Sequence, residues 1–263
     1  MPQTNDAFIM KTFDNLGFGD YFNAAYLKGK EAKLAEIPFE PGKLDFGGTA
    51  LVILPKVVEE KKLGDGFYVM KGFHATRMEE GKPDVSQFLP VYKTIGFNVD
   101  QANELLRGSA VRHLTGYKDN SPQFAYSQIN FLEKTENDNF KMMKRSDDGS
   151  LVKTLGTIGI IARQEEKEDI YQRLQKGERV AVNVRVGDSS KRLQIQAAVL
   201  KIGPGIDLFD GNGTLLKQYP EAVLKRMQPL KSLSDEKPVS AETAKIVTQT
   251  NNTKPLKEKK IHM

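Results

Sequence analysis

Residues 180–186 read VAVNVRV, so valine occupies every second position of this stretch. Such strict alternation is typical of a strand with one buried and one wet face, because successive side chains of a β-strand point to opposite faces. After the turn sequence GDSS at 187–190, the alternation resumes over 192–197 as RLQIQA. The two stretches predict an antiparallel β-hairpin with one basic, solvent-facing side.

The rest of the chain alternates helical and strand patterns without the spacing of βαβ units. Helical periodicity is expected at 6–16, 21–26, 98–108, 164–175 and 221–227, and strand-like patterns at 49–56, 67–78, 87–95, 124–132, 140–144 and 206–209. We therefore predict an α+β fold of mainly antiparallel sheets, built from hairpins with short packed helices.

The helix expected at 98–108 has the clearest boundaries. Asn98 and Gln101 have the spacing of a capping box, in which the first side chain accepts a hydrogen bond from a backbone N–H of the first turn. Gly108 is a typical helix end. This helix is expected to follow a boundary near Gly96, which divides the chain into an N-terminal α+β subdomain (1–95) and a C-terminal one (96–230).

Residues 231–263 form a third segment, rich in Lys, Ser, Thr, Asn and Pro. It has too few large apolar side chains to offset the entropy of ordering, so a disordered basic tail is expected. A short helix that forms on a partner is the alternative at 239–247.

Charge and composition exclude several classes of protein. The chain has 39 basic and 34 acidic residues, a net charge of +5, of which the tail carries +3, so the first 230 residues carry only +2. A net charge of +2 is too small for the strongly basic face that a dedicated duplex-DNA binder usually has. The absence of cysteine excludes disulfides and thiolate metal sites. Without an apolar run of about 18 residues or a signal-like N-terminus, no membrane contact and a cytoplasmic location are expected.

The chain shows no pattern that calls for catalysis. It has no phosphate-binding loop of the Walker type, and its histidines, at 74, 113 and 262, are too scattered for a metal triad. The DDGS sequence at 147–150 is expected to be a hairpin turn, and His113 to lie in a solvated loop after the helix. We predict a non-enzymatic protein with no catalytic residue, metal or cofactor. A hydrolase or nuclease would need convergent acids or a metal in a cleft.

Basic side chains are the better candidates for a site. One group lies on the predicted hairpin, a second at the end of the 140–144 strand, and a third follows the 98–108 helix, where Arg107 is expected to point outward beside Arg112 and His113. The candidate nucleic-acid-binding residues are Arg179, Arg185, Lys191 and Arg192; Lys141, Lys144 and Arg145; and Arg107 and Arg112. Interleaved with Tyr117 or Tyr126, such a surface can bind a single strand, rather than duplex, by charge and base stacking. The alternative is an ordinary solubilising surface.

Several stretches together resemble an uncharacterised family of Bacteroidetes proteins encoded on conjugative transposons and plasmids. They are NLGFG at 15–19, GFYV at 66–69, NVDQANELLRGSAV at 98–111, LQKGERVAVNVRV at 174–186 and IDLFDG at 206–211. Ser109 stands where that family usually has Arg. The resemblance implies an accessory protein of a mobile genetic element, associated with DNA transfer or replication. The alternative is an adaptor for a mobile-element or host protein, with a tail that folds on binding.

Overall fold

The computed structural model describes residues 5–186, 188–200 and 203–216. The predicted helix at 221–227 and the predicted disordered tail at 231–263 lie outside the described residues. Within them the fold is α+β, with three antiparallel sheets and short helices, as the sequence predicts. The helices are α1 (Asn5–Asn15), α2 (Asn23–Glu31), the 3₁₀ turn η1 (Lys61–Leu63), α3 (Val99–Leu106), α4 (Ser150–Ile158) and α5 (Gln164–Gln175).

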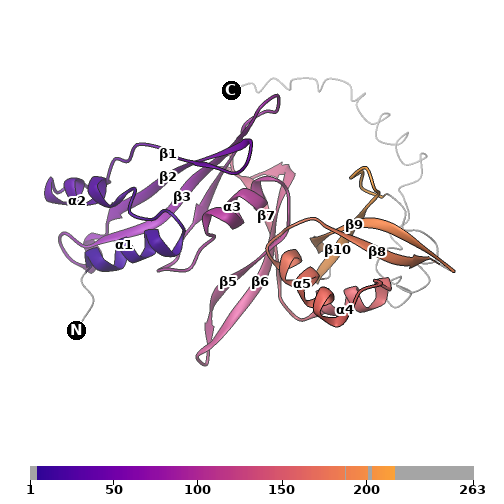
Figure 1. The fold of residues 1–263 in the computed structure, drawn as a ribbon. Coiled ribbons are helices and arrows are strands. Elements are labelled where there is room, and N and C mark those ends of the chain that lie inside the picture. The colour runs from indigo at the N-terminus through magenta and orange to yellow at the C-terminus, as the bar shows by residue number, and fades with distance from the viewer. Residues whose placement is uncertain (1–4, 187, 201–202, 217–263) are drawn as a thin grey trace, which may run out of the picture.

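The first sheet is a meander, with its strands in sequence order: β1 (Gly42–Asp45), β2 (Thr49–Glu59), β3 (Tyr68–Glu79) and β4 (Val85–Pro90). In Figure 1, α1 and α2 lie along this sheet. An aromatic cluster packs between these helices and the sheet. The ring of Phe13 lies 5.9–6.5 Å, centre to centre, from the rings of Phe18, Phe22, Tyr26 and Phe39.

The strand predicted at 87–95 is shorter in the structure. β4 ends at Pro90, and Tyr92 and Ile95 then exchange two backbone hydrogen bonds of 2.9 Å in a tight turn. Pro90 is opposite Gly72, and the N–H of Val91 still donates to the Lys71 carbonyl at 3.1 Å, so the chain leaves the sheet just after this bond. The missing N–H of Pro90 lies on the side away from β3, where an edge strand tolerates proline.

The middle sheet consists of β5 (Val111–Lys118), β6 (Ser121–Lys134) and β7 (Phe140–Ser146), and its central part, around residues 125–129, is covered on both faces. Val111 and Ile129 belong to the hydrophobic core that also holds the first sheet, whereas Tyr126 belongs to the second core. A strand buried on both faces does not alternate cleanly between apolar and polar residues. This explains the imperfect pattern at 124–132.

The third sheet has the order β10-β9-β8, from β8 (Val180–Val186), β9 (Ser189–Leu200) and β10 (Gly203–Phe209). Helices α4 and α5 cover one of its faces and share the second core with it. The prediction of a hairpin turn at 147–150 is wrong: this segment leads into α4, and the carboxylate of Asp148 accepts a 2.9 Å hydrogen bond from the N–H of Ser150.

Helix α3 has the predicted capping box. The Asn98 side chain accepts from the N–H of Gln101 at 2.9 Å, and the Gln101 side chain accepts from the N–H of Asn98 at 3.0 Å. The Gln101 amide also donates to the carbonyl of Arg112 at 2.9 Å, which fixes the start of β5 against the helix.

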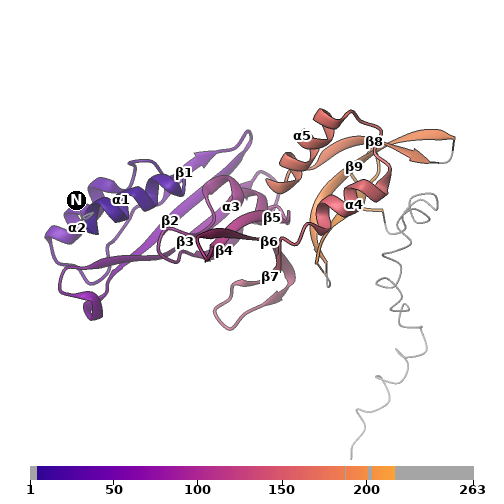
Figure 2. The ribbon, with the colours of Figure 1, turned by 90° about the horizontal axis from the view of Figure 1, so that it is seen from below.

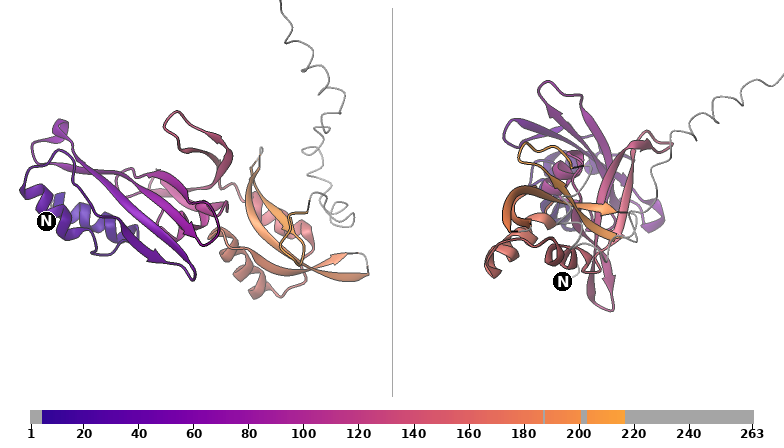
Figure 3. Two further views of the ribbon diagram at one scale, coloured as in Figure 1. Left: turned by 90° about the horizontal axis from the view of Figure 1, so that it is seen from above. Right: turned by 90° about the vertical axis from the view of Figure 1, so that its right-hand side faces the viewer.

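Figures 2 and 3 show the three sheets in a row, with the middle sheet between the other two. The first core extends past residue 96, since it includes Leu105 on α3 and Ile129 on β6. The two cores therefore meet at the middle sheet, and the division of the chain at residue 95 stays a prediction.

Candidate nucleic-acid interface

The predicted hairpin is formed by β8 and β9. Val182 pairs with Leu193, Val184 with Lys191, and Val186 with Ser189. Val180, Val182 and Val184 of β8 face the second core, and Ala181, Asn183 and Arg185 lie on the opposite face. On β9 that exposed face carries the even-numbered residues Ser190, Arg192, Gln194 and Gln196.

Arg185 and Arg192 lie near the tip of this face. Arg185 is opposite Ser190, and Arg192 is opposite Asn183, so the two guanidinium groups are diagonal neighbours on adjacent strands. Both are exposed, and within the described part of the chain neither forms an ion pair. Their charges are thus available to an external anion.

Arg179 lies at the other end of the same face. Its guanidinium stacks on the ring of Phe209, 3.7 Å from the ring centre. It also donates to the Gly213 carbonyl at 3.3 Å and to the side-chain oxygen of Gln196 at 3.4 Å. Arg179 and Arg185 are six positions apart in the sequence, which corresponds to about 20 Å along the strand direction.

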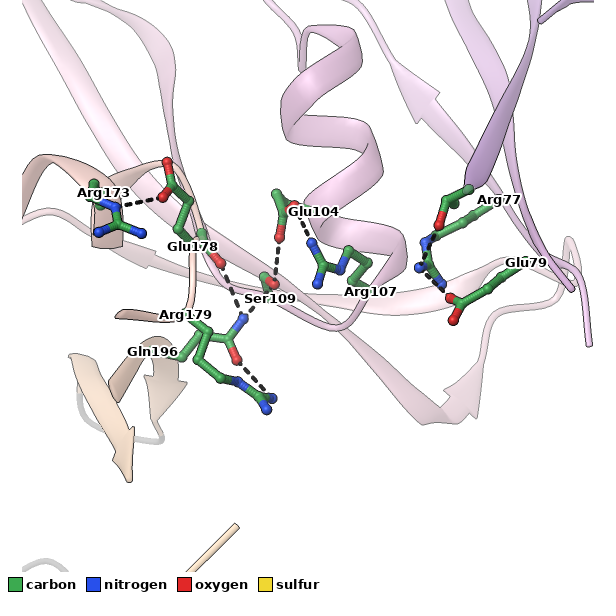
Figure 4. A network of polar contacts seen from close by, with 11 residues as sticks. Arg77, Glu79, Glu104, Arg107, Ser109, Arg173, Glu178, Arg179 and Gln196 are labelled. Atoms are coloured by element: carbon green, nitrogen blue, oxygen red, sulfur yellow. Dashed lines mark hydrogen bonds and ion pairs between the residues drawn. The ribbon is translucent and has the colours of Figure 1, made fainter. Parts of the chain in front are cut away.

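Gln196 connects this face to helix α3 (Figure 4). Its amide donates to the Gly177 carbonyl at 3.1 Å and to the hydroxyl of Ser109. Ser109 in turn donates to Glu104 at 3.0 Å, and Glu104 also accepts from Arg107 at 2.9 Å. Ser109 is only 1% exposed, so here it joins two parts of the fold and cannot reach an external anion.

The same face holds one carboxylate on β10. Asp207 is paired with Gln196 across the strands, and burial raises the pKa of its carboxyl group, against the opposing effect of Arg179. The inner end of the face therefore has Arg179 beside a carboxyl group, whereas Arg185 and Arg192 lie nearer the hairpin tip.

The structure does not place Lys191 with the arginines. Because Lys191 is opposite Val184, it lies on the side of the hairpin that faces the second core, near the tip where it is exposed. The wet basic face consists of the three arginines, and the expectation of a four-residue cluster is wrong on this point.

The second predicted group lies on β7, away from the hairpin tip (Figures 1 and 2). Lys141 pairs with Glu133 at 2.8 Å, and Arg145 donates to the backbone carbonyl of Lys144 at 3.0 Å. Lys144 points to the other face of the sheet, since it is opposite Ser127 whereas Arg145 is opposite Tyr126. These residues do not join the arginines of the hairpin.

The third group is also dispersed. Arg107 pairs with Glu104, whereas Arg112 pairs with Asp147 at 2.6 Å and stacks 3.7 Å above the centre of the Phe124 ring. His113 points to the opposite face of β5 and is buried, so the expectation of a solvated histidine beside these arginines is wrong.

His113 is held as a neutral base. One ring nitrogen lies 2.9 Å from the hydroxyl of Ser127, and the other lies 3.1 Å from the carbonyl oxygen of Leu114. The ring packs against Phe97, 4.2 Å away. Burial, with a smaller effect of Lys144, lowers the pKa of His113 to about 4. A neutral, buried imidazole does not bind an anion.

The aromatic partners also differ from the prediction. Tyr126 is fully buried and cannot stack on a base, whereas Tyr117, on β5, is 66% exposed. Sequence reasoning missed Phe209, which supports Arg179. The alternation of IDLF at 206–209 could have placed Phe209 on the wet face, opposite Gln194.

Within the described residues, no group of three or more His, Asp or Glu side chains could hold a metal ion. No described helix has both the length and the apolar character needed to cross a membrane. No family model matches the chain, and comparisons with curated proteins and with solved structures find no match.

Proposed function

We propose that this protein binds single-stranded nucleic acid through the exposed face of the β8–β9 hairpin, as a non-enzymatic, cytoplasmic accessory protein of a mobile genetic element. The observation that carries the proposal is the set of three arginines on one sheet face: Arg185 and Arg192 at the tip and Arg179 stacked on Phe209. The mobile-element setting rests on the sequence resemblance alone.

The chemistry of the face fits a phosphate backbone. Arginine presents a planar fork of donors that matches phosphate oxygens, and none of the three guanidinium groups forms an ion pair with a carboxylate among the described residues. Asn183 and Gln194 add amide donors and acceptors between the arginines. The modest net charge of the first 230 residues, +2, favours a short single-stranded site over the larger phosphate footprint of duplex DNA.

The test is binding of labelled single-stranded and duplex oligonucleotides by fluorescence anisotropy, at 50 and 200 mM salt. The variant Arg185→Gln/Arg192→Gln should bind single strands more weakly, with a slope of log affinity against log salt that is smaller by about 1.4 for two lost phosphate contacts. Lys191→Gln is the matched control, because it removes a charge from the opposite face of the same hairpin.

The proposal fails if the unchanged protein does not bind at 50 mM salt, where phosphate contacts are strongest. It also fails if Lys191→Gln weakens binding as much as the double arginine variant, because the exposed face would then not be the site. Tighter binding to duplex than to single strands would move the substrate class to double-stranded DNA.

A further inference from the structure

A groove runs along the outer edge of β8, on the far side of that strand from β9. It has a volume of about 540 Å³ and lies between β8, residues 160–162 and α5, from Glu165 to Arg173. Its floor and walls include Ile160, Ile161, Ala181, Glu165 and Asp169.

The edge of β8 in this groove is only partly paired. From the register, in which Val186 and Ser189 are the last pair of the ladder, the N–H and C=O groups of even-numbered residues of β8 point to β9, and those of 181, 183 and 185 point outward. Ile161 donates to the Asn183 carbonyl at 2.8 Å, and Arg185 donates to the Gly159 carbonyl at 3.1 Å. Across the described chain, no backbone hydrogen bond reaches the outward N–H of Asn183 or the outward N–H and C=O of Ala181. The pairing of β8 with residues 159–161 therefore ends at Asn183, and Ala181 faces the groove without a partner strand.

The wall formed by α5 is acidic. Glu166 is paired with Arg163 at 3.0 Å, and Arg173 is paired with Glu178 at 2.7 Å. Glu165 and Asp169 are exposed and have no cationic partner in the part of the chain that the structure describes. An open strand edge beside two unpaired carboxylates fits an extended, basic segment that adds a strand and places cations against α5.

We propose that this groove binds the chain's own C-terminal segment, Lys254–Lys260, as a short additional strand on β8. That segment reads KPLKEKK and contains four lysines and one glutamate, so its charge complements the groove. It is about 38 residues from Leu216, a length that spans up to about 125 Å when extended, so reach is not limiting. Its covalent link gives it an advantage over a separate peptide. The inference does not depend on nucleic-acid binding.

The test is amide hydrogen exchange at Ala181 in the full-length chain, read by NMR at low salt. For an effective concentration of about 1 mM and a dissociation constant of about 0.1 mM, docking protects this amide about tenfold. The tail variant K254E/K257E/K259E/K260E, which leaves residues 5–216 unchanged, should lose the protection. The groove variant E165K/D169K should lose it as well.

Combining the two variants swaps the charges and should restore the protection, which simple damage to the fold would not do. The control E80K/E136K, which reverses two exposed acids outside the groove, should leave exchange at Ala181 unchanged. Equal exchange rates in the unchanged chain and the tail variant would overturn the proposal. If the tail variant changes nothing but an added synthetic KPLKEKK peptide protects Ala181, the groove takes a basic strand from another molecule, and the assignment to the chain's own tail is wrong.

Discussion

Lowering the pH from 7 to 5 should reduce the free energy of unfolding through one buried side chain, His113. In the folded protein its ring is 8% exposed, packs against Phe97 and is hydrogen-bonded to Ser127, so protonation would place a charge in an apolar site near Lys144. Burial lowers the pKa of His113 to about 4, whereas an unfolded histidine titrates near 6.5.

The sign follows from proton binding. Between about pH 6.5 and pH 4 the unfolded chain binds this proton and the folded chain does not, so the stabilisation is complete above 6.5 and is lost as the pH falls. For pKa values of about 4 and about 6.5, the loss is about 2 kcal/mol between pH 7 and pH 5, and about 3 kcal/mol by pH 4.

The measurement is urea unfolding followed by far-ultraviolet circular dichroism at pH 7, 6 and 5. His113→Gln should be less stable than the unchanged protein at pH 7 but should lose about 2 kcal/mol less between pH 7 and pH 5. His74→Gln, at an exposed position on β3, serves as the control and should keep most of the pH dependence. If the unchanged protein and His113→Gln lose stability equally over this range, the reasoning about His113 is wrong.

Two further substitutions test how local geometry stabilises the fold. Asn98→Ala should lower the free energy of unfolding by about 0.5–2 kcal/mol by removing the α3 cap, and an unchanged urea midpoint would contradict this. Gly72→Ala should cost about 3 kcal/mol, because Gly72 has a φ of +154° and a Cβ there would lie 2.4 Å from the Leu89 carbonyl oxygen. Gly64→Ala, with a φ of +129° but open space around it, should cost clearly less in the same urea unfolding assay.

The sequence by itself determined the elements that are stabilised by contacts between residues close together in the chain. The capping box of α3 depends on two side chains three residues apart, and the β8–β9 hairpin on strict alternation around a short turn. Successive residues of β9 point to opposite faces, so the alternation alone indicates which of them face water. It could have shown, without a structure, that Lys191 and Arg192 lie on different faces of the hairpin.

Only the tertiary structure decided which polar side chains remain free. Arg112 and Asp147 are 35 residues apart in sequence and form an ion pair because β5 and the end of β7 flank β6. His113 and Tyr126 are buried because the central part of the middle sheet is covered on both faces, a fact that no single strand pattern contains. The physical reason is that alternation along a strand defines its two faces, but whether each face meets water or a second core depends on segments far away in the chain.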